Sequence, residues 1–238
     1  MRDVAIRCVA AGLLAALCTA CGDSPSVVAA PAELPTKPDV LAHPGYAAFA
    51  ADLRPGDVIF RGRSGGWGEL GARLSDMDTR YGHVGVVAED EGGGLSVIHA
   101  SGDPLTPEGR VRRDPLEAFL SRARRTGAYR PSLEPAQMEA FLRRLDGHVR
   151  DRTPFDPAYS LDTADALYCT EMVWRAWSVA TASEPVPERT EWRDRDVIAI
   201  DDLQLSPGLS LVAELDVETV ATTGAGVGKR LDGDAKSH

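Results

Sequence analysis

The pattern of apolar and polar positions predicts a mixed domain of short strands and amphipathic helices. Apolar residues recur at spacings of three and four along 135–149 and 169–179, the period of a helix with one buried face. Shorter runs rich in β-branched residues, at 57–60, 83–88 and 95–100, predict strands. Strands and helices in this mixed order indicate an α+β domain.

Weaker patterns complete this prediction. Three consecutive glycines within 89–94 predict a turn, so the strands on either side should form an antiparallel hairpin. Segments 69–75 and 115–125 predict shorter helices, and an extended piece closes at Tyr129, before Pro131.

The first residues have the pattern of an export signal. Arg2 and Arg7 precede the apolar stretch 8–17, which is too short for a membrane-spanning helix. We therefore expect residues 1–20 to be a signal peptide. No longer apolar run reaches the roughly 18 residues that a bilayer requires, which excludes a multi-pass membrane protein.

The small residues before Cys21 resemble the bacterial lipobox, in which this cysteine is lipidated and becomes the mature N-terminus. Cys18 occupies the position where that motif usually has leucine. Cleavage near Ala30 or Ala32, with release into the periplasm, is the alternative. With a lipid on Cys21, the protein would be anchored in the bacterial cell envelope, facing the periplasm or the exterior.

Composition then sets the domain boundaries. Residues 21–45 are rich in proline, alanine and serine, which predicts a lipidated N-terminus followed by a flexible tether. Residues 46–215 should form one domain, and the polar 216–238 a disordered tail.

The formal net charge of −10 argues against a nucleic-acid binder, which needs a basic surface. We expect a monomer that uses no cofactor and holds no metal.

Once the signal and the lipid site are set aside, Cys169 is the one cysteine left in the domain. It falls at the predicted start of the 169–179 helix, where unpaired N–H groups and the helix dipole favour a thiolate. This position predicts a reactive thiol with a lowered pKa. The alternative is a small buried apolar residue.

A thiolate nucleophile requires an imidazole, and His83 and His99 lie on the two strands of the predicted hairpin. They share a face of the sheet if the numbers of paired residues add up to an even value, as when 83 pairs with 99. A pairing of 84 with 99 would separate them. His148, late in the 135–149 helix, is interpreted as a charge partner of the helix C-terminus.

Five blocks in this order resemble a known family: residues 53–60, 81–87, 97–100, 154–156 and 167–174. The set is similar to the permuted papain-like amidases of the YaeF/YiiX group, which are distant relatives of NlpC-type cell-wall hydrolases. The resemblance implies a circularly permuted papain-like domain, with an antiparallel sheet packed against helices.

The resemblance also implies roles for single residues. Cys169 matches the nucleophile and His83 the general base, while the orienting position falls on His99, where many relatives have glutamate. The backbone N–H of Cys169 would stabilise the oxyanion. Tyr168 or Tyr81 would supply a second donor, with simple packing as the alternative.

The implied activity is hydrolysis of an amide bond, through a thioester acyl-enzyme, in a peptide, a peptidoglycan peptide or an acyl-amide. A lipid acyltransferase or esterase of the lecithin:retinol acyltransferase type would use the same residues, because only the acceptor differs. A catalytically inactive surface lipoprotein used for binding is the third possibility.

Overall fold

The structure, a computed structural model, describes residues 39–62, 75, 77–102, 108–186 and 188–217, all within one unit that spans residues 37–238. Several predicted features lie outside the described residues: the signal peptide, Cys21, nearly all of the 69–75 helix, and all but two residues of the tail. In chain order the elements are η1 (Val40–Ala42), α1 (Tyr46–Asp52), β1 (Val58–Gly62), β2 (His83–Glu89), β3 (Leu95–Ser101), β4 (Arg110–Pro115), α3 (Leu116–Leu120), β5 (Arg125–Pro131), α4 (Pro135–Arg150), α5 (Cys169–Thr181), β6 (Thr190–Glu191), β7 (Asp196–Val197), α6 (Ile200–Gln204) and β8 (Leu209–Asp216).

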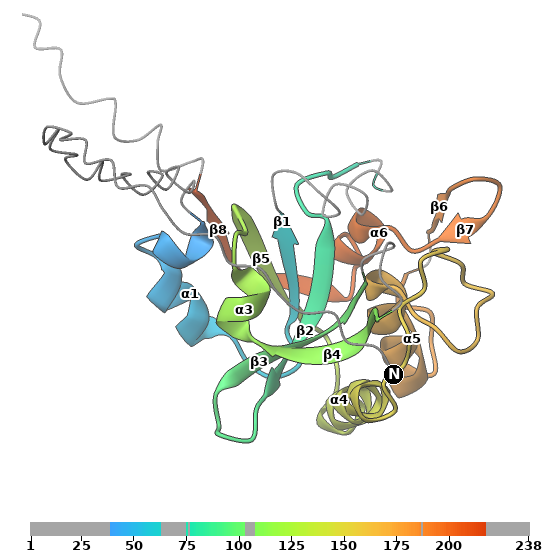
Figure 1. The fold of residues 1–238 in the computed structure, drawn as a ribbon, viewed down its shortest axis with the longest axis horizontal. Coiled ribbons are helices and arrows are strands. Elements are labelled where there is room, and N and C mark those ends of the chain that lie inside the picture. The colour runs from blue at the N-terminus through green and yellow to red at the C-terminus, as the bar shows by residue number, and fades with distance from the viewer. Residues whose placement is uncertain (1–38, 63–74, 76, 103–107, 187, 218–238) are drawn as a thin grey trace, which may run out of the picture. The chain divides into compact units, whose positions relative to one another are not determined.

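An antiparallel sheet of six strands organises the fold, in the order β4-β3-β2-β1-β5-β8. Strands β6 and β7 form a separate hairpin. Figure 1 shows α1 and α3 on one side of the sheet, with α4 and α5 on the other. This mixed architecture of antiparallel sheet and helices confirms the predicted α+β class.

Alternation along the strands produces a separate hydrophobic core on each face. Phe60, Val84 and Val86 belong to the core that includes α4 and α5. Val87 and Val97 belong to the second core, which includes residues of α1 and α3. Because β2 contributes alternate residues to both cores, it is buried on both faces and its register is firmly specified.

The register of the β2–β3 hairpin differs by two residues from the pairing of 83 with 99. Val86 lies opposite Ile98, so the numbers of paired residues add up to 184 and not 182. The longer loop, residues 90–94, accounts for the difference, because the Asp90 carboxylate accepts from the N–H groups of Gly92 and Gly94. The value is even, so His83 and His99 do share a face.

Helices α4 and α5 confirm the two strongest periodic patterns, whereas the predicted 115–125 helix is wrong beyond Leu120. The α3 helix ends there, and Arg122 has a left-handed φ of 63°. From Arg125 the chain instead pairs with β1 and β8. Tertiary pairing therefore overrides a local helical preference in this segment.

The ordered chain also extends beyond the predicted elements. Val40, inside the predicted tether, is fully buried, and its N–H donates to the carbonyl of Ala123. Strands β4 and β8 were not predicted, and they form the two edges of the sheet. Within the described residues, no helix has the length and apolar character to cross a membrane.

Candidate active site

Cys169 is the first residue of α5, and its side chain is 7% exposed. It packs in the same core as Val84 and Met172, so the sulfur faces the sheet. Burial raises the pKa of the thiol to about 11, although N–H groups of Val84, Thr170 and Cys169 and the charge of Arg61 act in the opposite direction. The expected lowering of the pKa by the helix start is therefore outweighed by desolvation.

The start of α5 is fixed by hydrogen bonds on both sides of the cysteine. The hydroxyl of Tyr168 accepts from the N–H of Ile198 at 2.8 Å, and the hydroxyl of Thr170 donates to the carbonyl of Ile198 at 2.5 Å. The buried Glu171 carboxylate accepts from the N–H of Tyr168 and from Arg175 Nε. These contacts fix the position of the Cys169 backbone, and none of them is a hydrogen bond to the sulfur itself.

The two histidines form a hydrogen-bonded relay on the other face of the sheet. His83 Nε2 lies 2.9 Å from His99 Nδ1, and His99 Nε2 lies 3.0 Å from Asp114 Oδ2. Both imidazole rings also contact the ring of Phe119, with centroids 5.6 Å and 5.1 Å away. Of the two arrangements that the sequence left open, the structure has the one in which His83 and His99 are neighbours, and Asp114 joins them.

The protons along this relay can be assigned from the groups at its end. Hydrogen bonding by His99 lowers the pKa of Asp114, so this group is a carboxylate that accepts. Burial lowers the pKa of His99, so its ring is neutral and has one N–H, at Nε2. His99 Nδ1 must then accept from His83 Nε2–H. A neutral His83 consequently has Nδ1 as its basic nitrogen.

The thiol and the relay approach each other at the first residues of β2. The N–H of Val84, the residue after His83, is hydrogen-bonded to the sulfur and acts on the thiol pKa. Arg61, whose Cα is paired with that of His83 across β1 and β2, acts on it too. Cys169 therefore reaches the start of β2 from the α5 face, while His83 and His99 occupy the α3 face.

Gly85 allows this crowded arrangement. A Cβ at this position would lie 2.4 Å from Val97 Cγ1, 2.9 Å from the Ile98 carbonyl oxygen and 3.1 Å from His99 Cβ. Only glycine lets β3 approach this closely, so packing alone explains the glycine at position 85, two residues after His83.

A comparison with models of protein families shows which family the chain belongs to. The model described as "Permuted papain-like amidase enzyme, YaeF/YiiX, C92 family" matches residues 52–196. The chain belongs to this family of permuted papain-like amidases. Family membership establishes a hydrolase of the amidase type. No curated protein matches the chain.

Among solved structures, the chain is similar to one described as "metalloprotein yiiX from Escherichia coli O157:H7". The TM-score is 0.57 at 18% identity, over 69% of this chain and 99% of that one. This similarity supports the permuted papain-like fold. In the part of this chain that the structure describes, no three His, Cys, Asp or Glu side chains gather as a metal site.

The structure engages both tyrosines that the sequence suggests as oxyanion donors in this amidase. The Tyr81 hydroxyl donates to Glu214 Oε1 at 2.8 Å, which directs it toward β8. The Tyr168 hydroxyl is buried and accepts from Ile198. Their contacts are those expected of packing residues.

Two residues near the site were missed by sequence reasoning. Asp114 lies on the unpredicted strand β4, and the alternation of Val111 with charged neighbours was the available signal. Tyr159 has a left-handed φ of 51°, and its ring centroid lies 5.2 Å from that of Tyr168. Burial raises the Tyr159 pKa, and the charge of Cys169 contributes. No sequence signal pointed to Tyr159.

Proposed function

We propose that this family member is a cysteine amidase in which Cys169 is the nucleophile, His83 the general base and His99 the orienting residue. The observation that supports this most is the ordered relay from the Asp114 carboxylate through His99 to His83, which ends beside the residue hydrogen-bonded to the Cys169 sulfur. A merely structural cysteine would not require such a relay.

The raised pKa of the thiol changes the expected chemistry. A buried thiol with a pKa of about 11 stays protonated at neutral pH, so the resting site holds a neutral Cys169. His83 is the first residue of β2 and lies before the first β2–β3 pair, Val86 with Ile98, and in this proposal the two side chains meet at that end of the strand. There His83 Nδ1 takes the proton as the sulfur attacks the amide carbonyl. Asp114 stabilises the charge that then spreads over the two imidazole rings.

The remaining steps use groups that already surround the sulfur. The N–H groups of Cys169 and Thr170 are directed at it, and they can stabilise the tetrahedral oxyanion. The imidazolium of His83 donates its proton to the leaving amine, and the C–N bond breaks to give a thioester. His83 next takes a proton from water, which attacks the thioester and releases the carboxylic acid and the thiol.

The proposed substrates are peptidoglycan peptides or acyl-amides, reached from a membrane to which lipidated Cys21 anchors the protein. This location rests on the sequence alone, because Cys21 lies outside the described residues. The similar yiiX protein is described as a metalloprotein. Since His83 and His99 direct ring nitrogens at each other, they do not converge on one ion, and we route no step through a metal.

The activity is tested by incubating the purified full chain with muropeptides and, separately, with phospholipids, followed by mass spectrometry of the products. We expect amide cleavage that disappears in Cys169→Ala. Transfer of lipid acyl groups without amide cleavage would favour the acyltransferase alternative. Absence of both reactions would support the binding lipoprotein.

The resting protonation state has its own test. Iodoacetamide alkylation is followed from pH 6 to 10, with peptide mapping to isolate Cys169 from the other cysteines. We expect the Cys169 rate to keep increasing up to the highest pH, because the thiolate forms only there. A plateau below pH 7 would instead indicate a preformed thiolate–imidazolium pair.

A further inference from the structure

A cleft lies between α4 and α5, and its lining includes neither Cys169 nor the histidine relay. It has a volume of about 540 Å³, and Arg143, Arg144, Arg150 and Arg175 line it together with His148. Two aspartates, Asp151 and Asp165, are the acidic residues of its wall. A cleft with this excess of cations stands out in a chain of net charge −10.

Several hydrogen-bond donors in this cleft have no partner among the described residues. Among the described residues, Arg144 forms no ion pair, whereas Arg143 pairs with Glu139 and Arg150 with Asp151. Arg175 uses Nε for Glu171 and Nη2 for the carbonyl of Leu161, and no described residue accepts from its Nη1. Unused guanidinium donors are therefore available on both helices.

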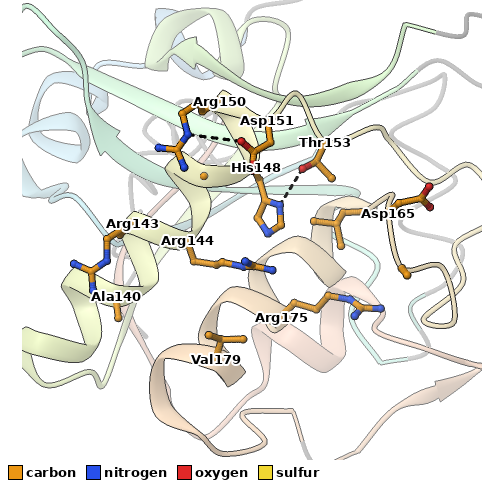
Figure 2. A pocket seen from close by; sticks show the side chains of 13 residues that line it. Ala140, Arg143, Arg144, His148, Arg150, Asp151, Thr153, Asp165, Arg175 and Val179 are labelled. Atoms are coloured by element: carbon orange, nitrogen blue, oxygen red, sulfur yellow. Dashed lines mark hydrogen bonds and ion pairs between the residues drawn. The ribbon is translucent and has the colours of Figure 1, made fainter.

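His148 adds a polar atom to the same place. Its Nδ1 lies 3.0 Å from Thr153 Oγ1, while its buried Nε2 has no hydrogen-bond partner among the described residues. Figure 2 shows the Arg144 and Arg175 side chains extending below the His148 ring. Burial and these two cations lower the pKa of His148, which is therefore not the charged C-terminal partner that the sequence suggested.

We propose that this cleft binds the phosphate group of a small phosphate ester. Arg144 and Arg175 supply planar charged donors, the chemistry that proteins use for phosphate, and His148 donates from Nε2 when Thr153 donates to Nδ1. The volume exceeds that of inorganic phosphate. Ala140, Ala164 and Leu167 provide an apolar wall for the organic part of the ligand.

The proposal does not depend on the cysteine chemistry, so binding can be measured directly. The full chain is titrated with sn-glycerol 3-phosphate by calorimetry, and the imidazole signal of His148 is followed by NMR. We expect saturable binding and a shift of that signal. Absence of any saturable shift, or acetate binding as tightly as the phosphate ester, would overturn the proposal.

Two variants identify the cleft as the site. Arg144→Gln removes a cation with no ion-pair partner among the described residues, and a lost charged hydrogen bond should weaken binding about tenfold or more. Gly147→Glu places a carboxylate where an added Cβ meets only Arg150 Nη2, at 3.6 Å, and should abolish binding. Glutamate also favours a helix over glycine, so the fold should persist.

Arg193→Gln is the matched control, because it removes an exposed arginine from the β6–β7 hairpin, outside the cleft. It should bind as the parent does, and unchanged affinity in Arg144→Gln would contradict the assignment. Dibutyroyl phosphatidic acid, a soluble lipid analogue, distinguishes the sources of the phosphate. Tighter binding than glycerol phosphate supports a lipid headgroup, and equal binding supports a free ester.

Discussion

The two halves of the proposed site lie on opposite faces of one sheet and are held there by different means. On the α5 face, Cys169 is fixed by apolar packing and by hydrogen bonds to neighbouring backbone, and burial suppresses its charge. On the α3 face, His83 and His99 form a polar chain that ends at Asp114, whose side chain is 23% exposed and pairs with Arg112.

In the proposed mechanism, the position of the sulfur and the removal of its proton therefore depend on different faces of the sheet. The buried face fixes the position of the sulfur but makes its ionisation costly, whereas in the proposed mechanism the polar face supplies the proton acceptor. If the proposal is right, reactivity depends on the relay, and a substitution on either face should weaken the site separately. The variants below test that division, from the largest expected effect to the smallest.

Replacing His83 removes the proton acceptor without disturbing the Cys169 face. We expect His83→Ala to lower kcat by about 10²- to 10⁴-fold, the usual contribution of a general base, and to cost about 1–3 kcal/mol of stability because the buried His99 Nδ1 loses its donor. Steady-state kinetics with an amide substrate measures the loss. His43→Ala, which alters a histidine outside the site, should keep full activity. Equal losses in both variants would contradict the role of His83.

Glu171→Gln tests the buried face through the pH dependence of stability. Burial raises the pKa of Glu171 to about 7 from an ordinary value of 4.5, so the folded state holds the proton more tightly than the unfolded state. Stability from this group is present below pH 4.5 and is lost as pH rises toward 7. Linkage gives up to about 3 kcal/mol over that window.

The variant should flatten this part of the curve of unfolding free energy against pH, as measured by urea denaturation at each pH. Glu139→Gln changes an exposed glutamate on α4 and serves as the control. The opposite result would be a parent protein whose stability rises from pH 4.5 to 7, with that rise absent in Glu171→Gln. It would show that the Glu171 carboxyl is ionised in the folded state.

Gly85→Ala tests the close approach of β2 and β3. The added Cβ would meet Val97 Cγ1 and the Ile98 carbonyl oxygen at distances that force the strands apart. Overpacking of this kind costs about 1–3 kcal/mol of unfolding free energy. Gly147→Ala, where a Cβ has room, should be neutral or stabilising. Urea denaturation midpoints measure both variants. Equal shifts in Gly85→Ala and Gly147→Ala would contradict the close approach of β2 and β3 at Gly85.

Asp114→Asn tests the end of the relay, where Asp114 acts as a positioning residue. Loss of one charged hydrogen bond to His99 should lower kcat about tenfold and leave KM nearly unchanged. The optimum of the pH–rate profile should shift, since the carboxylate no longer favours protonated imidazole. Asp114→Glu should restore much of the rate. An unaltered pH profile in Asp114→Asn would assign the carboxylate a structural role only.

Patterns with a strong local cause could be predicted from the sequence. The periodic helices α4 and α5 and the strands β1 to β3 follow from hydrophobic spacing. Hairpin geometry predicted only that an even register would place His83 and His99 on one face, and the structure, not the sequence, supplies that register. Cys169 lies at the start of α5, as the periodicity of that helix predicted.

Features that depend on tertiary context could not be predicted from the sequence. Strand β4 has one buried residue, Val111, among charged neighbours, so its sequence carries little strand signal and Asp114 was missed. The pKa of Cys169 depends on how deeply α5 packs against β2, which no local rule reveals. Likewise, Arg125 joins β5 because β1 and β8 provide partners on both sides.

Strand β8 has a consequence for anyone who shortens the chain. The family match ends at residue 196, yet β8 (Leu209–Asp216) covers the outer side of β5. A fragment cut at that boundary would expose the unpaired backbone of β5, a template for aggregation. It would also lose Ile198, which hydrogen-bonds the Tyr168 and Thr170 hydroxyls on either side of Cys169.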